Sequence, residues 1–333
     1  MLNKIKKISK IPKSFIAFTL GFIIALLVGF FVLFFIFFEL KNNLIASVQS
    51  AFVKENNNLQ LNVNENSPEA NLHFEALLRP LSFPIQKTDV ALPQLSARSA
   101  ILEDFSNGRI LFEKNINQKL QIGSLTKLIS AIVALENFDV NKTVKLTASD
   151  VAFKGSVLRF FAGEQYSVES LLKFALIESN NNAIYAIANL MGIDEFVEKM
   201  NSAARRIGLK NTNFQNPIGL DNENNYSTAS DMAILLNHLN QFPLIKTILA
   251  QKSVEIYSLE KRKIIVKNSN RLVDETDIIA AKTGTTEKAG QNYAAFVRAP
   301  DNRELILIIL NSQDRYQDAK NLLNWLKNGF LWQ

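Results

Sequence analysis

The stretch from Phe15 to Phe38, which contains no charged side chain, constrains this chain more than any other feature of its sequence. At about 1.5 Å per residue, a helix of about 24 residues crosses a hydrocarbon core of about 30 Å. The apolar region of a cleaved signal peptide is shorter, about 7 to 15 residues, and the small residues between Ala46 and Ala51 offer only a weak cleavage site. We therefore expect an uncleaved transmembrane signal anchor over residues 14–40, with cleavage as the alternative.

Basic residues on one side of this stretch predict its orientation. Five lysines lie within the first thirteen residues, whereas Glu39 and Lys41 follow the stretch. The positive-inside rule keeps the lysine-rich end in the cytoplasm. We therefore expect residues 1–13 to be a cytoplasmic tail, the helix to contact the lipid bilayer, and everything after residue 40 to lie outside the membrane. The five lysines are Lys4, Lys6, Lys7, Lys10 and Lys13.

Charge and composition exclude several classes of function. The net charge of +6 owes much to the N-terminal lysines; elsewhere Lys and Arg are mixed with Asp and Glu, so nucleic-acid binding is not indicated. The chain has no cysteine, which excludes disulfides, thiolate metal sites and a cysteine nucleophile. A Ser-His-Asp triad is disfavoured because there are only two histidines, His73 in an expected linker and His238 in a helical pattern.

The exported part divides into a linker and one domain. Residues 41–92 are rich in asparagine and proline, which predicts an extracytoplasmic linker, and residues 93–330 form the expected catalytic domain. The order of strands, then helices, then strands and a helix predicts an α+β domain whose sheet is completed by the C-terminal strands. The expected strands are 97–103, 110–113, 254–257, 263–267, 278–282, 293–297 and 304–310, and the expected helices are 124–138, 168–177, 183–191, 193–207, 230–239 and 316–326.

The first candidate motif, Ser124-Leu125-Thr126-Lys127, lies at the start of an expected helix. Residues three apart on a helix share a face, so Lys127 can lie beside the Ser124 hydroxyl. A serine becomes a strong nucleophile when a base removes its proton, and a lysine can do this once burial or nearby cations lower its pKa. By itself the motif is not specific, because serine is also a common N-cap.

Two further polar motifs are equally unspecific when each is taken alone. Ser179-Asn180-Asn181 lies between two expected helices, where a hydroxyl can relay a proton and an amide can hold a substrate, but where helix caps are usual. Lys282-Thr283-Gly284-Thr285 follows an apolar strand. Its cation and hydroxyls suit a carboxylate, and its glycine allows a substrate backbone to approach closely, but a strand ending in a polar turn would carry similar residues.

Together and in this order, Ser-x-x-Lys, Ser-x-Asn and Lys-Thr-Gly resemble the serine penicillin-recognising enzymes. The surrounding sequence, from about Leu95 to Leu326, is similar to the D-alanyl-D-alanine carboxypeptidase family in particular. The segments that carry this similarity are 99–104, 108–115, 122–128, 163–164, 167–172, 216–220 and 226–233.

The resemblance implies a β-lactamase/transpeptidase-like domain, in which an antiparallel sheet is flanked by helices. It implies that Ser124 is the acylated nucleophile, Lys127 its activator, and Ser179 with Asn181 the proton relay and positioning pair. Lys282 to Thr285 would be the substrate strand, and the backbone N–H groups of Ser124 and Thr285 the oxyanion hole. The implied substrate is a peptidoglycan stem peptide ending in D-Ala-D-Ala, the implied inhibitors are β-lactam antibiotics, and no metal or cofactor is expected.

The sequence departs from the family pattern in three places. The family often has His or an aromatic residue at the position of Thr285; threonine here is similar to the transpeptidase branch, which leaves donor specificity open. The chain ends at Gln333 without the family's usual C-terminal β-domain and amphipathic anchor. We expect the N-terminal span to replace that anchor. Arg298 is a candidate for the substrate carboxylate, with a surface role as the alternative.

Other functions of the same fold remain open. A D,D-endopeptidase or a transpeptidase differs from a carboxypeptidase in cleft shape and acceptor access rather than in the three motifs. A class A β-lactamase is disfavoured because no convincing Glu-containing loop lies between Asn181 and Lys282. A non-catalytic wall-binding scaffold is the least favoured alternative, because the polar residues of all three motifs are present. The oligomeric state is not predicted.

Overall fold

The computed structural model describes residues 84–152 and 159–332, which lie within one compact unit, Ser82–Gln333. The expected cytoplasmic tail, the expected transmembrane helix and nearly all of the expected linker fall outside these residues. In the part of the chain that is described, no helix combines the length and apolar character needed to cross a membrane.

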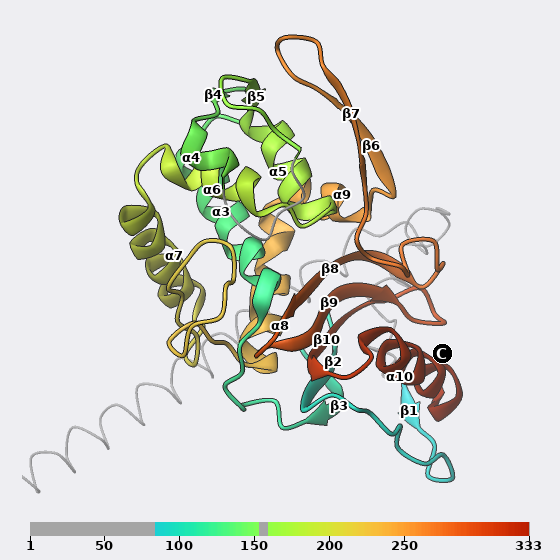
Figure 1. Ribbon diagram of the computed structural model, residues 1–333. Coiled ribbons are helices and arrows are strands. Elements are labelled where there is room, and N and C mark those ends of the chain that lie inside the picture. The colour runs from blue at the N-terminus through green and yellow to red at the C-terminus, as the bar shows by residue number, and fades with distance from the viewer. Residues whose placement is uncertain (1–83, 153–158, 333) are drawn as a thin grey trace, which may run out of the picture. The chain divides into compact units, whose positions relative to one another are not determined.

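A five-stranded antiparallel sheet forms the centre of the fold, with strand order β3-β2-β10-β9-β8 (Figure 1). The β2–β3 hairpin, at the start of the domain, joins the C-terminal strands through the pairing of β2 with β10, as the order of elements predicted. This α+β architecture with an antiparallel sheet and helices confirms the expected fold class. The strands are β2 (Ser99–Asp104), β3 (Ile110–Lys114), β8 (Ile278–Thr286), β9 (Gly290–Arg298) and β10 (Glu304–Ser312).

The middle of strand β10, from Leu305 to Leu310, is apolar without interruption because both of its faces are covered. Ile306, Ile308 and Leu310 belong to the core shared with the helical layer, whereas Leu305 and Leu307, with Ile309, belong to the core beneath the last helix, α10 (Arg315–Gly329). Successive side chains of a strand point to opposite faces, so one continuous run supplies two cores. Figure 1 shows α10 beside the sheet and most other helices gathered on the other side.

The helical layer is built around α3 (Lys127–Asn137), whose residues from Lys127 to Ala134 are all buried. A helix that is buried on every side must be surrounded by others, and α3 contacts α5, α6 and α7. The surrounding elements are α4 (Ala148–Val151), α5 (Val168–Ile177), α6 (Asn181–Asn189), α7 (Ile193–Ile207), α8 (Ala229–His238) and α9 (Pro243–Ala250), with the strand pair β4 (Thr143–Lys145) and β5 (Gln165–Ser167), and the 3₁₀ turns η1 (Gly123–Thr126) and η2 (Leu239–Gln241).

Helix α9 was not among the expected helices. It begins at Pro243, and proline suits the first position of a helix because the missing N–H has no partner there in any case. Its buried residues Ile245, Ile248 and Leu249 have helical spacing, but the helix is only eight residues long. An apolar pattern this short does not distinguish a helix from another buried segment, which explains why the sequence did not reveal it.

Two of the expected C-terminal strands do not join the central sheet. β6 (Ser253–Tyr257) and β7 (Lys263–Lys267) form a separate two-stranded hairpin, which corrects the expectation that the C-terminal strands all complete one sheet. Their outward residues are exposed and their inward residues Ile256, Ile264 and Val266 pack on the helical core. The strand composition of these segments predicted strands correctly, but composition cannot identify the partner strand.

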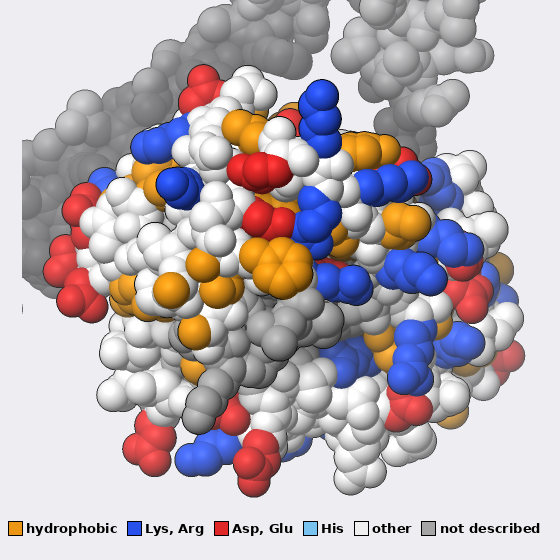
Figure 2. Space-filling view, turned by 45° about the horizontal axis from the view of Figure 1, so that its top comes forward, with side chains coloured by type: hydrophobic (Ala, Val, Ile, Leu, Met, Phe, Trp, Pro, Cys, Tyr) orange, Lys and Arg blue, Asp and Glu red, His pale blue; other side chains and the backbone are white. Residues whose placement is uncertain are grey.

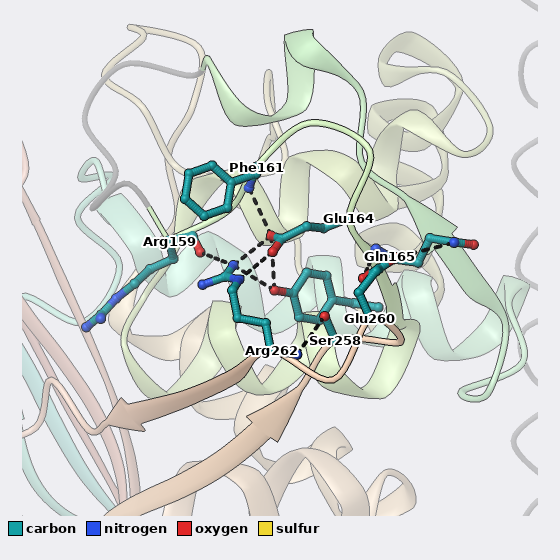
Figure 3. A network of polar contacts seen from close by, with 8 residues as sticks. Arg159, Phe161, Glu164, Gln165, Ser258, Glu260 and Arg262 are labelled. Carbon is teal, nitrogen blue, oxygen red and sulfur yellow. Dashed lines mark hydrogen bonds and ion pairs between the residues drawn. The ribbon is translucent and has the colours of Figure 1, made fainter.

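The tip of this hairpin is held to the helical layer by Arg262 (Figure 3). Its guanidinium donates to Glu164 Oε2 at 2.6 Å, to the Arg159 carbonyl at 2.7 Å and to Tyr166 Oη at 3.0 Å. The Glu164 side chain is mostly buried, and charge-assisted bonds in such a place are stronger than bonds between neutral groups. The hairpin is therefore fixed at its free end as well as at its base.

The folded domain begins before the expected boundary at residue 93. β1 (Ile85–Gln86) pairs with β11 (Phe330–Leu331), so residues at the end of the expected linker belong to the domain. The prolines at 84 and 93 suggested a linker, but proline is also tolerated beside a short edge strand. The pairing joins the two ends of the described domain beneath α10.

Candidate active site

The start of the helical layer and the edge strand β8 approach each other with no side chain between them. A Cβ added at Gly284 would lie 2.6 Å from the Ile122 carbonyl oxygen and 3.0 Å from the Ser124 backbone nitrogen. Real Cβ atoms do not come so close, so only glycine permits this contact. The glycine of the third motif thereby places β8 directly against the turn η1, which carries Ser124.

Lys127 joins the first motif to the second. Its Nζ lies 2.8 Å from Ser124 Oγ, 2.7 Å from Asn181 Oδ1 and 3.0 Å from the Ile218 carbonyl oxygen. An ammonium can donate to all three oxygens, whereas a neutral amine can donate to two of them and accept the hydroxyl proton of Ser124. The same position therefore suits the lysine before and after it takes the serine proton.

The surroundings of Lys127 favour its neutral form. Its side chain is fully buried, and burial followed by the nearby charge of Lys282 holds its pKa well below the ordinary value. Among the described residues, the three groups that bond Lys127 Nζ are a hydroxyl, an amide oxygen and a backbone carbonyl, and none is a carboxylate that would stabilise the charged form. A lysine in such a place can act as a base near neutral pH, which an exposed lysine cannot.

Lys282 joins the second motif to the third. Its Nζ donates to Ser179 Oγ at 2.7 Å and to the Thr283 carbonyl at 2.9 Å. Burial, with a smaller contribution from Arg315, lowers the pKa of Lys282 to about 7. The two lysines thus lie on either side of the Ser179–Asn181 segment, one bonded to each of its ends.

The Ser179–Asn181 segment is a tight connection between α5 and α6. Ser179 has a φ of +68°, in the left-handed region that is uncommon for residues with a side chain. Asn180 is the N-cap of α6, and its Oδ1 accepts the Ala183 N–H at 3.1 Å. The structural role expected for this motif therefore belongs to Asn180, while the residues on either side of it face the lysines.

A cleft of about 580 Å³ opens above these groups. Ser124, Ser179, Asn181, Thr283 and Thr285 line it, whereas Lys127 and Lys282 are buried beneath. The structure therefore brings together the three motifs, which are far apart in the sequence. The cleft is also lined by residues that the sequence did not single out, namely Ser269, Arg271, Gln291, Asp314, Arg315 and Tyr316.

Arg315, at the start of α10, supports the end of β8. Its Nη1 donates to the carbonyls of Gly284 and Asn292 at 2.8 and 2.9 Å, its Nη2 bonds Thr285 Oγ1, and its Nε donates to Gln291 Oε1 at 3.2 Å. The side chain is mostly buried. This arginine places a positive charge next to the Thr285 hydroxyl and orients that hydroxyl.

The strand register explains why Arg315 lies at the cleft and Arg298 does not. Thr285 pairs with Gln291, and Gln291 pairs with Ser312, so the end of β10 and the start of α10 lie beside Thr285. Arg298 pairs with Glu304 at the opposite end of β9 and is exposed. Of the two readings of Arg298, the surface role fits its position. No local motif marks Arg315, because its place depends on the pairing of three strands.

The surface around the domain is unevenly charged. In Figure 2, Lys and Arg side chains gather on the right, the side on which the β6–β7 hairpin lies in Figure 1, whereas Asp and Glu are frequent at the left margin. The hairpin contributes Lys261, Arg262, Lys263 and Lys267 to the sequence that leads into the cleft residues Ser269 and Arg271. Two of these cations are already paired, Arg262 with Glu164 and Lys263 with Glu255.

Comparison with known proteins gives a consistent result. The family model for D-alanyl-D-alanine carboxypeptidase matches residues 86–314. The D-alanyl-D-alanine carboxypeptidase DacC of Escherichia coli is 34% identical over 272 residues, which are 76% of this chain and 66% of that protein. The D-alanyl-D-alanine endopeptidase of Pseudomonas aeruginosa is 30% identical over 259 residues, 74% of this chain and 82% of that protein.

Among solved structures, the DD-transpeptidase of Streptomyces K15 superimposes with a TM-score of 0.67 at 25% identity, covering 71% of this chain and 98% of that one. The fold is therefore of the penicillin-binding, transpeptidase-like kind. The chain spans about two thirds of the length of the carboxypeptidase DacC.

Proposed function

Because this chain belongs to the D-alanyl-D-alanine carboxypeptidase family, we propose that it is a serine-type carboxypeptidase that removes the terminal D-alanine from peptidoglycan stem peptides. The observation that carries this proposal is the position of Lys127 Nζ, within hydrogen-bond distance of both Ser124 Oγ and Asn181 Oδ1 at the floor of an open cleft. A buried, neutral lysine beside a serine can serve as the base that activates the hydroxyl for acyl transfer.

In the acylation step, Lys127 takes the proton of the Ser124 hydroxyl as Oγ attacks the carbonyl carbon of the D-Ala-D-Ala amide. The negative charge that develops on the carbonyl oxygen is stabilised by the backbone N–H groups of Ser124 and Thr285. The close approach of β8 to η1 at Gly284 supports this pairing of N–H groups from two elements. The serine ester forms as the C–N bond breaks.

The leaving amine must receive a proton as the C–N bond breaks. Ser179 is suited to deliver it, because its hydroxyl lines the cleft and accepts a hydrogen bond from Lys282. A pKa of about 7 for Lys282 allows it to supply or recover that proton near neutral pH. Water then attacks the ester carbonyl carbon and gives its proton to the Ser179–Lys282 pair, while Lys127 returns its proton to Ser124 Oγ as the ester C–O bond breaks. The peptide shortened by one residue is released.

The terminal carboxylate of the substrate binds at the end of β8. The hydroxyls of Thr283 and Thr285 line the cleft side by side on one face of the strand, and the positive charges of Lys282 and Arg315 lie beneath them. A carboxylate placed there receives hydrogen bonds and favourable electrostatics together. β-Lactam antibiotics, which also carry a carboxylate, bind in the same way and acylate Ser124.

A D,D-endopeptidase is the second candidate. It is favoured by the match to the Pseudomonas aeruginosa endopeptidase over 82% of that protein's length, compared with 66% for the carboxypeptidase DacC. The chemical steps are the same, but the leaving amine then belongs to a cross-linked peptide rather than to D-alanine. A transpeptidase, in which another amine replaces water, stays as a further alternative.

We also propose that the enzyme is held in the cytoplasmic membrane by its N-terminal segment, with the catalytic domain outside. The uncharged stretch from Phe15 to Phe38 and the lysines before it support this proposal. The full chain should remain with membranes after alkaline carbonate extraction, and a chain beginning at residue 84 should not. Recovery of the full chain in the soluble fraction would refute the anchor.

The enzymatic proposal is tested with a fluorescent penicillin and mass spectrometry of the labelled protein. We expect a covalent adduct on Ser124, loss of the adduct in Ser124→Ala, and release of D-alanine from a pentapeptide by the unaltered protein. Ser202→Ala, an exposed serine on α7, is the matched control and should label normally. Failure of the folded protein to form an adduct would favour the scaffold alternative.

A further inference from the structure

The cleft continues past the proposed substrate strand on the side of Thr283. The hydroxyl of Ser269 lies 3.0 Å from Thr283 Oγ1, and the Tyr316 hydroxyl donates to the Ser269 carbonyl at 3.1 Å. The backbone N–H of Arg271 lies 3.4 Å from Tyr316 Oη. These contacts form a continuous wall from Thr283 to Arg271, and all four residues line the cleft.

Arg271 supplies a cation at the outer end of this wall. Its guanidinium carbon lies 5.8 Å from the centroid of the Tyr316 ring, and the residue is exposed. Within the described residues, 84–152 and 159–332, its guanidinium has no acidic partner. Arg315 differs, because most of its N–H groups already donate to oxygens of the protein. Arg271 therefore has donors available for a ligand.

The other charged groups of the cleft do not neutralise Arg271. Asp314 is the acidic residue of the cleft lining, and its Oδ1 accepts the N–H groups of Tyr316 and Gln317 at 3.0 and 3.1 Å as the N-cap of α10. The helix N-terminus offsets part of this negative charge. Arg315 and the buried Lys282 add positive charge, so an anion entering along this wall is attracted.

We propose that Arg271, held against the Tyr316 ring, forms an outer anion-binding subsite for the leaving side of the substrate. The inference rests on the proposed function, in which Thr283 and Thr285 bind the terminal carboxylate. The outer subsite accepts a second carboxylate on the leaving amine, such as the side chain of an acidic D-amino acid or a carboxylate of a larger leaving peptide. D-Alanine has no second carboxylate and leaves this subsite unused.

The test uses two substrates that differ in charge but not in shape, an acylated D-Ala-D-Glu and the corresponding D-Ala-D-Gln. For the unaltered protein we expect kcat/KM to be about fivefold higher for D-Glu, because a charge-assisted contact at a partly exposed site is worth about 1 kcal/mol. Arg271→Gln should bring the ratio close to one. Raising the salt concentration should reduce the ratio in the unaltered protein only.

Charge reversal separates a binding role from a structural one. Arg271→Glu should invert the preference, so that an acylated D-Ala-D-Lys is cleaved faster than D-Ala-D-Glu. Arg298→Gln, an exposed arginine outside the cleft, is the matched control and should keep the ratio of the unaltered protein. Because Arg271 is exposed, both of its variants should fold, and their thermal unfolding should be checked.

The outcomes distinguish this proposal from the proposed function. Equal cleavage of D-Ala-D-Glu and D-Ala-D-Gln by the unaltered protein, or an unchanged ratio in Arg271→Gln, would overturn the outer subsite and leave the carboxypeptidase intact. Absence of both cleavage and Ser124 acylation by penicillin in the unaltered protein would overturn the proposed function itself.

Discussion

Lys127 Nζ lies 2.7 Å from Asn181 Oδ1, a contact between residues that are 54 positions apart in the chain. A neutral amide oxygen accepts a hydrogen bond from the lysine without stabilising its positive charge as strongly as a carboxylate would. The identity of this one side chain therefore helps to set the pKa of the proposed base.

Asn181→Asp tests this role. A carboxylate beside Lys127 should raise the pKa of the lysine by about 1 to 3 units, so the neutral fraction near neutral pH falls and acylation slows, most strongly at the acidic end of the profile. The rising limb of the pH profile should move to higher pH. The measurement is the second-order rate of penicillin acylation between pH 5 and 10.

Asn324→Asp, an exposed asparagine of α10, adds the same charge outside the cleft and serves as the control. Its acylation profile should match that of the unaltered protein. A profile for Asn181→Asp that also stays in place would show that Lys127 is not the titrating base.

Titration of Lys282 should make substrate binding weaken as the pH rises, whereas deprotonation of Lys127 makes acylation faster. Burial and Arg315 lower its pKa to about 7, so the lysine is charged below this pH and neutral above it. Binding of a substrate with a free terminal carboxylate should weaken as the pH rises from 6 to 8, because the cation beneath Thr283 is lost. KM should therefore rise over this range.

A substrate whose terminal carboxylate is replaced by an amide provides the comparison for Lys282. Its KM should be higher throughout and nearly independent of pH between 6 and 8. If the two substrates respond equally to pH, the lysine does not contribute to carboxylate binding through its charge.

Gly284→Ala should disrupt the site through the backbone. The added Cβ would lie 2.6 Å from the Ile122 carbonyl oxygen, so β8 must move away from η1. We expect destabilisation of about 1 to 3 kcal/mol, as for other overpacked sites, and a loss of acylation larger than the loss of stability explains. Denaturant unfolding and penicillin labelling measure the two effects.

Gly208→Ala is the control for a glycine substitution. Gly208 has a φ of +94°, so alanine is strained there, but a Cβ would meet no atom within 4 Å. This variant should lose stability by about 1 kcal/mol and label normally once folded. Normal labelling of Gly284→Ala would contradict the proposed oxyanion hole.

Arg262→Ala should release the tip of the β6–β7 hairpin. The variant loses the bonds to Glu164, Arg159 and Tyr166, and we expect about 1 to 2 kcal/mol of destabilisation. Lys263→Ala is the matched control, because its ion pair with Glu255 is half-exposed and should contribute little. Thermal unfolding of both variants gives the comparison.

The pH dependence of this effect has a defined sign. Burial raises the pKa of Glu164. The hydrogen bonds from Arg262 and the Phe161 N–H, together with the charge of Arg262, lower this pKa by a larger amount, so the net shift is downward. A carboxyl whose pKa is lower in the folded state stabilises that state at pH values above its unfolded pKa of about 4.3. This stabilisation is lost as the pH falls through the pKa of the folded state. The stability that Arg262→Ala loses should therefore be largest above about pH 4.3 and should shrink as the pH falls through the folded value of Glu164. A stability difference that does not change between pH 7 and pH 3 would contradict this linkage.

The sequence by itself determined the local structure and the chemical inventory. Apolar periodicity located α5 and α7, and strand composition located β7, with the bounds that the structure has, because both signals depend on neighbouring residues. The three motifs identified the residues that line or underlie the cleft, because serine, lysine and asparagine carry specific chemistry wherever they are brought together.

Only the tertiary structure decided which distant residues meet. The register of β8, β9 and β10 places Arg315 beside Thr285 and Arg298 at the far end, and the path after β7 brings Arg271 to the cleft. Burial of Lys127 and Lys282, which lowers both pKa values, likewise depends on packing among many elements. Strand pairing and desolvation arise from contacts between distant segments, and no local pattern of side chains records them.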